Sequence, residues 1–207
     1  ERLSLTEVHR FPNAPVRLPD GLHWDVLRLW GEIVTGIAKA VRESGGSLTS
    51  IGLDTWGVDF GLLDTQGRLL ENPYFYRDDR TDGMIEEAFQ RLPKAQIFEQ
   101  TGIQFMQLNS LYQLLSMVVN RSPVLDLAAT FLMMPDLFNY WLSGTTACEF
   151  SIATTSQCYD PRRRTWAHPL LEALDIPTGI FPGIVPPGTV LGPLLPSLEV
   201  ETGAKGV

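Results

Sequence analysis

The chain has 207 residues, of which 44% are hydrophobic and 19% charged, which is the composition of an ordinary globular domain with enough residues for a core. Its formal net charge of −8 at pH 7 argues against nucleic acid or an anionic membrane surface as the main partner. Two cysteines, Cys148 and Cys158, make no disulfide framework and favour a reduced, cytosolic protein, and no apolar run of about 18 residues predicts a membrane span.

The first part of the chain predicts a strand, a helix and a second strand in that order. Residues 3–11 have a strand-like pattern, and residues 12–21 are predicted to form a loop. Asp25 is expected to cap a helix whose apolar residues recur at helical spacing as far as Val41, and the pair at residues 45–46 is expected to end it.

Two strands are predicted next, one around residues 51–53 and one from residue 58 to residue 63. A hairpin turn at residues 64–67 is expected to follow, because Gly67 tolerates a positive φ. The return strand is predicted to start at Leu69 and to break at Pro73.

The middle of the chain is predicted to be helical. Helices are expected at residues 84–92, 94–101 and 110–120, and Pro135 and Gly144 suit the two ends of another. Beyond Pro161 the chain is rich in proline and reads as irregular. The order of elements indicates an α/β domain that carries a helical insertion.

The most informative segment is residues 51–60, Ile-Gly-Leu-Asp-Thr-Trp-Gly-Val-Asp-Phe. Polar and aromatic residues follow a predicted buried strand, and strand ends are where α/β sheets bind ligands. Asp54 and Thr55 suit hydroxyl groups, Trp56 suits a sugar C–H face, and Gly57 lets a ligand touch bare backbone. A core role for Trp56 remains an alternative. Asp54 and Asp59 would point to opposite faces of a strand, so they are not expected to share a metal or acid/base site.

A second group of polar and aromatic residues lies at positions 74–81. The run from Arg77 to Arg80 follows three aromatic residues, and it is either a substrate clamp or a self-paired surface cluster. Gln104 and Asn109 suit sugar hydroxyls, although loops also use amides for turn chemistry. The residue types alone indicate a domain for a small polyhydroxylated ligand and specify no reaction.

Nine stretches spread over nearly the whole chain resemble one family in their order and spacing. They are residues 7–11, 24–25, 51–60, 76–84, 101–105, 109–114, 134–144, 151–157 and 186–192. The chain resembles the FGGY family of carbohydrate kinases. Within that family, Asp54-Thr-Trp-Gly-Val-Asp-Phe60 is similar to the members that act on L-rhamnulose, whereas xylulose and glycerol kinases carry other residues there.

The resemblance implies two actin-like (ribonuclease-H-like) domains that close on ATP and a sugar, with residues 1–207 supplying most of the N-terminal one. The implied reaction transfers a phosphoryl group from ATP, with Mg²⁺, to the 1-hydroxyl of L-rhamnulose. Gly57 matches the sugar-contacting position of this domain in the family. Trp56, Tyr76, Asp78 and Gln104 lie in neighbouring stretches that line the sugar pocket of related kinases.

The resemblance also implies that a first strand with a phosphate-contacting turn precedes Glu1, and that the catalytic Asp and the second domain follow Val207. No residue of this chain is therefore assigned the base, the nucleotide or the metal, and the 207-residue chain is expected to lack kinase activity. Two alternatives remain open, a kinase for another ketose such as L-fuculose and a sugar-binding module without catalysis. An actin-like chaperone ATPase would share the fold and leave the Asp-Thr-Trp-Gly segment unexplained.

Overall fold

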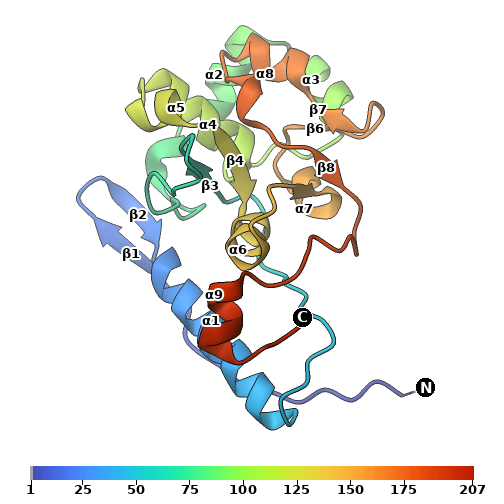
Figure 1. Ribbon diagram of the computed structural model, residues 1–207. Coiled ribbons are helices and arrows are strands. Elements are labelled where there is room, and N and C mark those ends of the chain that lie inside the picture. Colours follow the sequence, from blue (N-terminus) through green and yellow to red (C-terminus); the bar gives the residue numbers. More distant parts are fainter. Residues whose placement is uncertain (1) are drawn as a thin grey trace.

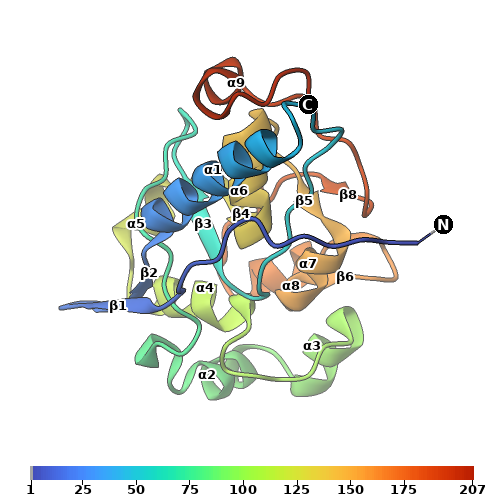
Figure 2. The ribbon, with the colours of Figure 1, turned by 90° about the horizontal axis from the view of Figure 1, so that it is seen from below.

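A computed structural model describes residues 2–207 and shows a short central pair of antiparallel strands with helices on both sides (Figures 1 and 2). The strands are β1 (Pro15–Leu18), β2 (Gly21–Trp24), β3 (Phe60–Leu63), β4 (Thr130–Met133), β5 (Cys148–Glu149), β6 (Tyr159–Asp160), β7 (Thr165–Trp166) and β8 (Ile184–Val185). The α-helices are α1 (Val26–Glu43), α2 (Met84–Arg91), α3 (Lys94–Thr101), α4 (Ser110–Val119), α5 (Pro123–Leu127), α6 (Met134–Ser143), α7 (Phe150–Thr155), α8 (His168–Ala173) and α9 (Pro196–Thr202). Two short 3₁₀ helices, η1 (Asp79–Thr81) and η2 (Thr178–Ile180), complete the set.

The antiparallel pair β3–β4 separates two hydrophobic clusters, because successive side chains of a strand point to opposite faces. Phe60 and Leu62 face the larger cluster, with α2, α4, α8 and η2. Leu63 and Leu132 face the other side and pack with α1 and α6. The three layers are visible in Figure 2, where α1 and α6 lie on one side of β3 and β4, and α4 and α2 lie on the other.

The long helix α1 has the boundaries that its sequence predicts. The side chain of Asp25 accepts a hydrogen bond from the backbone N–H of Arg28 at 3.2 Å, which satisfies one free donor of the first turn. One face is buried from Val26 to Val41, and Gly45 then adopts a φ of 71° just beyond the end. In Figure 1, α9 lies beside α1, and the two helices are in contact.

The predicted loop at residues 12–21 is wrong, because β1 and β2 form a hairpin that projects from the body in Figure 1. The prolines of this segment suggest a loop, but each occupies a place that needs no paired N–H. Pro15 begins the edge strand, and Pro19 lies in the turn between the strands. Val16 pairs with His23 in the register of the hairpin.

The strands predicted at residues 3–11 and 51–53 are not formed in the described residues. Residues 3–11 and 51–53 are extended but belong to no ladder, and Leu3 and Leu5 are 82% and 86% exposed. A segment with alternating apolar residues forms a strand only if a neighbouring backbone pairs with it. No strand within residues 2–207 pairs with either of these segments. Of the predicted return strand after the turn at residues 64–67, the structure has a single bridge between Leu63 and Leu69.

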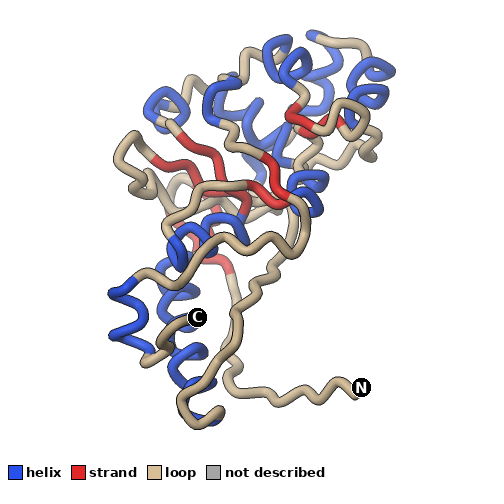
Figure 3. The backbone as a smooth tube through the Cα atoms, turned by 45° about the vertical axis from the view of Figure 1, so that its right-hand side comes forward, coloured by secondary structure: helices blue, strands red, loops and turns tan. Residues whose placement is uncertain are grey.

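The helices of the middle region are confirmed, and the end of the chain is more ordered than predicted. Helices α2, α3, α4 and α6 fall within one or two residues of their predicted ranges, and Gly144 ends α6 with a φ of 78°. The region beyond Pro161 contains α8, α9 and two two-residue strands, β7 and β8, which are too short to produce a period in the sequence. Figure 3 shows how much of this region is loop between the short elements.

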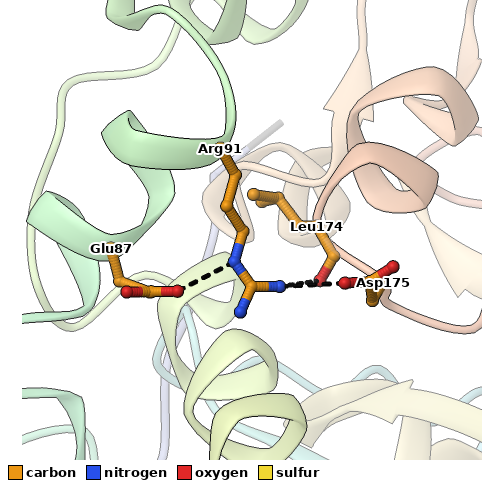
Figure 4. Close-up of polar contacts among 4 residues, drawn as sticks. All are labelled: Glu87, Arg91, Leu174 and Asp175. Carbon is orange, nitrogen blue, oxygen red and sulfur yellow. Dashed lines mark hydrogen bonds and ion pairs between the residues drawn. The ribbon is translucent and has the colours of Figure 1, made fainter.

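Arg91 at the end of α2 connects this helix to the segment that follows α8 (Figure 4). Its Nε donates to Glu87 at 2.9 Å, and its Nη1 donates to the side chain of Asp175 at 3.0 Å and to the carbonyl of Leu174 at 3.4 Å. No helix within residues 2–207 has the length and apolarity to cross a membrane.

Candidate functional site

The turn at residues 54–59 is held by a carboxylate that the sequence analysis left aside. Asp59 is fully buried, and its Oδ2 accepts hydrogen bonds from the indole Nε1 of Trp24 at 2.6 Å and of Trp56 at 2.8 Å. The two indole rings lie 4.3 Å apart between centroids. Trp56 is half-buried, so one part of its ring packs inward while the rest remains accessible.

The other oxygen of Asp59 continues the network into the helical layer. Oδ1 accepts from Nε2 of Gln113 on α4 at 3.0 Å, and Oε1 of Gln113 accepts from Arg80 at 2.7 Å. The Arg80 guanidinium stacks over the ring of Tyr74 at 3.9 Å. Burial raises the pKa of Asp59 to about 6, against the opposing effect of its three N–H donors and of Arg80.

Val58 lies in the left-handed region with a φ of 69°, which is costly for a β-branched residue. Its N–H donates to Oγ1 of Thr155 on α7 at 3.1 Å. Its carbonyl accepts from Oγ of Ser110 at 2.5 Å and from Gln113 at 3.2 Å. Three side chains from α4 and α7 therefore fix the backbone of the turn.

Gly57 is required where the turn meets α7. A Cβ at residue 57 would lie 2.9 Å from Oγ1 of Thr155 and 3.0 Å from its Cβ and Cγ2. The close approach to this glycine is therefore made first by the protein itself, on the side where a side chain would project. The glycine is half-buried, and its carbonyl accepts from the backbone N–H of Asp59 at 2.9 Å.

Tyr76 joins the same aromatic group, and Asp78 has a structural task. The ring of Tyr76 is half-buried, 4.6 Å from the ring of Phe75 and 6.5 Å from that of Trp24. The buried carboxylate of Asp78 accepts from the backbone N–H of Leu22 at 2.7 Å and from that of Arg80 at 3.0 Å. The two carboxylate oxygens of Asp78 therefore link the β1–β2 hairpin to η1.

In the described part of the chain, the charged side chains from Arg77 to Arg80 form no ion pairs with one another. Arg77 and Asp79 are exposed, whereas Arg80 points inward to Gln113. Burial lowers the pKa of Arg80, and its nearby acids oppose this shift. The four residues thus divide between the surface and the buried network.

The predicted amides lie on the loop between α3 and α4, in different surroundings. Gln104 is exposed and lines an open, mostly apolar hollow of about 750 Å³ with Phe98 and Phe105. Asn109 is buried, and its amide donates to Gln157 at 2.7 Å and to the carbonyl of Gln104 at 3.0 Å. Asn109 therefore shapes the loop that presents Gln104.

A second hollow of about 570 Å³ lies between residues 49–53, α6 and residues 185–194. Asp136 lines it, and Oδ1 of Asp136 accepts from the backbone N–H of Glu149 at 3.0 Å while Oδ2 has no partner in the described structure. Burial raises the pKa of Asp136 to about 6. Asp54 is exposed, whereas Asp59 is fully buried.

The described acidic, histidine and cysteine side chains are not clustered. Within residues 2–207 there is no group of three or more His, Cys, Asp or Glu side chains arranged to hold a metal ion. Both cysteines are buried and unpaired, and burial raises their pKa.

The raised pKa values of Asp59 and Asp136 predict an unusual pH dependence of stability. Between the unfolded value of about 4 and the folded value of about 6, the folded chain binds more protons than the unfolded chain. The contribution of each group to the free energy of unfolding therefore increases as the pH falls, by about 1 kcal/mol between pH 7.5 and pH 5. Urea titrations at the two pH values measure this change.

The matched variant for that measurement is Asp136→Asn, which removes one of the two titrating groups. The gain in unfolding free energy on acidification is expected to be smaller in the variant than in the unmodified chain. An equal gain in both proteins would contradict the assignment of a raised pKa to Asp136.

The sequence analysis assigned no role in supporting the turn to Trp24, Asp59, Arg80, Gln113 or Thr155. The one available signal was an acidic residue, Asp59, among apolar residues and three positions after Trp56. The hydrogen bond from Trp24 to Asp59 joins residues that are 35 positions apart, so no local sequence pattern predicts it.

Comparison with known proteins places the chain among sugar kinases. Residues 10–207 match the FGGY family of carbohydrate kinases, N-terminal domain. The chain is 40% identical over 202 residues to a rhamnulokinase of Oceanobacillus iheyensis, covering 98% of this chain and 43% of the relative. It is 38% identical over 205 residues to a rhamnulokinase of Bacteroides thetaiotaomicron, covering 99% of this chain and 42% of the relative. The chain thus spans about two fifths of the length of these curated relatives.

Solved structures confirm the expected fold. A gluconate kinase from Lactobacillus acidophilus superposes with a TM-score of 0.84 at 18% identity, over 92% of this chain and 39% of that one. Plasmodium falciparum glycerol kinase with ADP superposes with a TM-score of 0.75 at 14% identity, over 93% of this chain and 40% of that one. At such identities the likeness shows the fold alone, an actin-like α/β domain of the sugar-kinase type with a helical insertion.

Proposed function

Because the chain belongs to the FGGY family of carbohydrate kinases, we propose that it is the N-terminal part of a kinase that converts L-rhamnulose to L-rhamnulose 1-phosphate with ATP. Relatives named rhamnulokinase, about 40% identical over nearly the whole chain, support this choice of sugar. The likeness to structures of other sugar kinases bears on the fold and leaves the choice of sugar to the site itself.

The observation that carries the proposal is the aromatic group beside Gly57. Trp56 and Tyr76 are half-buried and are joined through the buried ring of Trp24. A 6-deoxyketose has C–H faces and a methyl group that pack on aromatic rings, and hydroxyls that need backbone or amide partners. The wall of this chain offers both kinds of contact at neighbouring positions.

We assign the sugar contacts to the faces of Trp56 and Tyr76, to the backbone of Gly57 and to the amide of Gln104. Asp78 was a further candidate, and we leave it out because both its oxygens bond backbone N–H groups. We place the catalytic Asp and the contacts to ATP and Mg²⁺ in parts of the complete protein outside residues 1–207. The role of this chain in the reaction is then to bind and orient the ketose.

The experiment is a substrate panel with the complete protein that contains this chain. L-rhamnulose, L-fuculose, L-ribulose and D-xylulose are compared in a coupled assay for ADP release. We expect the largest kcat/KM with L-rhamnulose, by about tenfold or more, since one misplaced polar group in a sugar site costs at least that factor. NMR of the product is expected to show the phosphate on the 1-hydroxyl.

Each other outcome selects an alternative. A higher kcat/KM for L-fuculose would replace the proposed sugar, and sugar binding without ADP release would indicate a binding module. The 207-residue chain serves as the control, and we expect no sugar-dependent ADP release from it.

A further inference from the structure

We propose that Asp59 is a positioning residue for the sugar, whose carboxylate sets the place of the Trp56 ring and of the backbone at residues 56–58. This inference rests on the proposed function and adds to it a residue that makes no contact with the substrate. Its basis is the arrangement of donors around one buried side chain.

Three donors from three separate segments converge on Asp59. Trp24 comes from β2, Trp56 from the turn and Gln113 from α4, at 2.6, 2.8 and 3.0 Å. The carboxylate is fully buried, so its bonds are not exchanged with water. A charged acceptor that is shared in this way fixes the half-buried Trp56 ring relative to β2 and α4.

The same network holds the strained backbone next to Gly57. Val58 has a φ of 69°, a conformation that persists only when its surroundings enforce it. Nε2 of Gln113 donates to the carbonyl of Val58 at 3.2 Å as well as to Asp59 at 3.0 Å. Asp59 and the strained turn are therefore supported by one amide, and loss of the carboxylate frees both.

The site admits a carboxylate and rejects an amide of the same shape. An asparagine at residue 59 would aim its NH₂ group either at the two indole donors or at Nε2 of Gln113. Gln113 cannot turn its amide over to accept, because its Oε1 accepts from Arg80 at 2.7 Å and its Nε2 also donates to the carbonyl of Leu108 at 2.9 Å. Asp59→Asn therefore keeps the volume of the side chain and breaks the pattern of donors and acceptors.

Protonation has the same consequence as the amide. A proton on Asp59 turns one acceptor into a donor where three donors already point. Of the groups that act on this carboxylate, Arg80 of η1 is charged, whereas Trp24, Trp56 and Gln113 are neutral. Because burial raises the pKa of Asp59 to about 6, sugar binding is expected to weaken as the pH falls through that value.

The test compares Asp59→Asn with Asp136→Asn in the complete protein. Both variants replace a buried carboxylate whose pKa is raised to about 6, but Asp136 on α6 accepts from the backbone N–H of Glu149 and makes no hydrogen bond to residues 54–59. For Asp59→Asn we expect the KM for the ketose to rise about tenfold or more, with the KM for ATP unchanged and kcat changed less than the KM. For Asp136→Asn we expect an unchanged KM for the ketose.

The pH profile of the unmodified protein keeps the test valid if Asp59→Asn fails to fold. The KM for the ketose is expected to rise below pH 6, although the contribution of Asp59 to stability increases over the same range. A KM for the ketose that is flat down to pH 5, or an equal loss for both substrates in Asp59→Asn, would overturn the positioning role.

A readout without turnover separates this inference from the proposed function. Acrylamide quenching of tryptophan fluorescence is expected to increase in Asp59→Asn, where the Trp56 ring is released, and to stay constant in Asp136→Asn. If no sugar is phosphorylated and the quenching still differs in this way, the proposed function fails and the anchoring by Asp59 stands. Equal quenching in both variants would contradict the claim that Asp59 holds the Trp56 ring in place.

Discussion

Gly57→Leu is expected to raise the KM of the complete kinase for its ketose by about tenfold or more and to lower the free energy of unfolding by about 1–3 kcal/mol. The first atom of the new side chain would lie 2.9–3.0 Å from Oγ1, Cβ and Cγ2 of Thr155. Cβ of Thr155 is fixed to the backbone of α7 and cannot move aside, so the turn must shift. The shift carries Trp56 and the backbone of the sugar wall with it.

A side chain at residue 57 would therefore affect folding as well as the binding of the ligand. The contact with Thr155 makes a cost in stability unavoidable. Gly57→Ala with Thr155→Ser is the control, because serine lacks Cγ2 and keeps the hydroxyl that accepts from Val58. The double variant is expected to be more stable than Gly57→Ala alone. Steady-state kinetics and urea unfolding would contradict the prediction if Gly57→Leu matched the unmodified protein in both.

Trp24→Ala is expected to lower the free energy of unfolding by about 3–5 kcal/mol, the usual range for a large buried aromatic residue. Trp24 is 6% exposed and packs on the rings of Trp56 at 4.3 Å and Phe75 at 4.8 Å. Its removal also takes one of the three donors from Asp59. Chemical denaturation measures the loss, and it is expected to be accompanied by a higher KM for the ketose.

Trp166→Phe supplies the matched control for Trp24→Phe. Trp166 is equally buried, at 3% exposure, and its indole donates to the carbonyl of Pro182 at 2.6 Å, in the other hydrophobic cluster. Both variants lose one hydrogen bond and are expected to lose about 1–2 kcal/mol of stability. An increase in the KM for the ketose is expected for Trp24→Phe alone, and the same increase in both would show that the effect is general loosening.

Elements with local end signals could be predicted from the sequence. The N-cap Asp25 and the glycines after residue 44 set α1, and Gly144 sets the end of α6, because caps act within one turn of a helix. Pairing between strands could not be predicted in the same way. Residues 15–24 form a hairpin in spite of their prolines, and residues 3–11 form no strand in spite of their alternation.

The position of the candidate site was visible in the sequence, and its supports were not. The Asp-Thr-Trp-Gly segment is unusual enough to single out Trp56 and Gly57. Asp59 gains its meaning from Trp24 and Gln113, which are 35 and 54 positions away, and such contacts depend on the packing of β2 and α4. Thr155 is a similar case, since only the approach of α7 explains why residue 57 carries no side chain.

The central claim is that a ketose lies against the Trp56–Gly57 turn, and a crystal structure of the complete protein with L-rhamnulose tests it most directly. The account predicts the sugar in contact with the backbone of Gly57 and with the ring of Trp56, while Asp59 keeps both indole bonds. A sugar bound at any place where this turn is out of contact would contradict it.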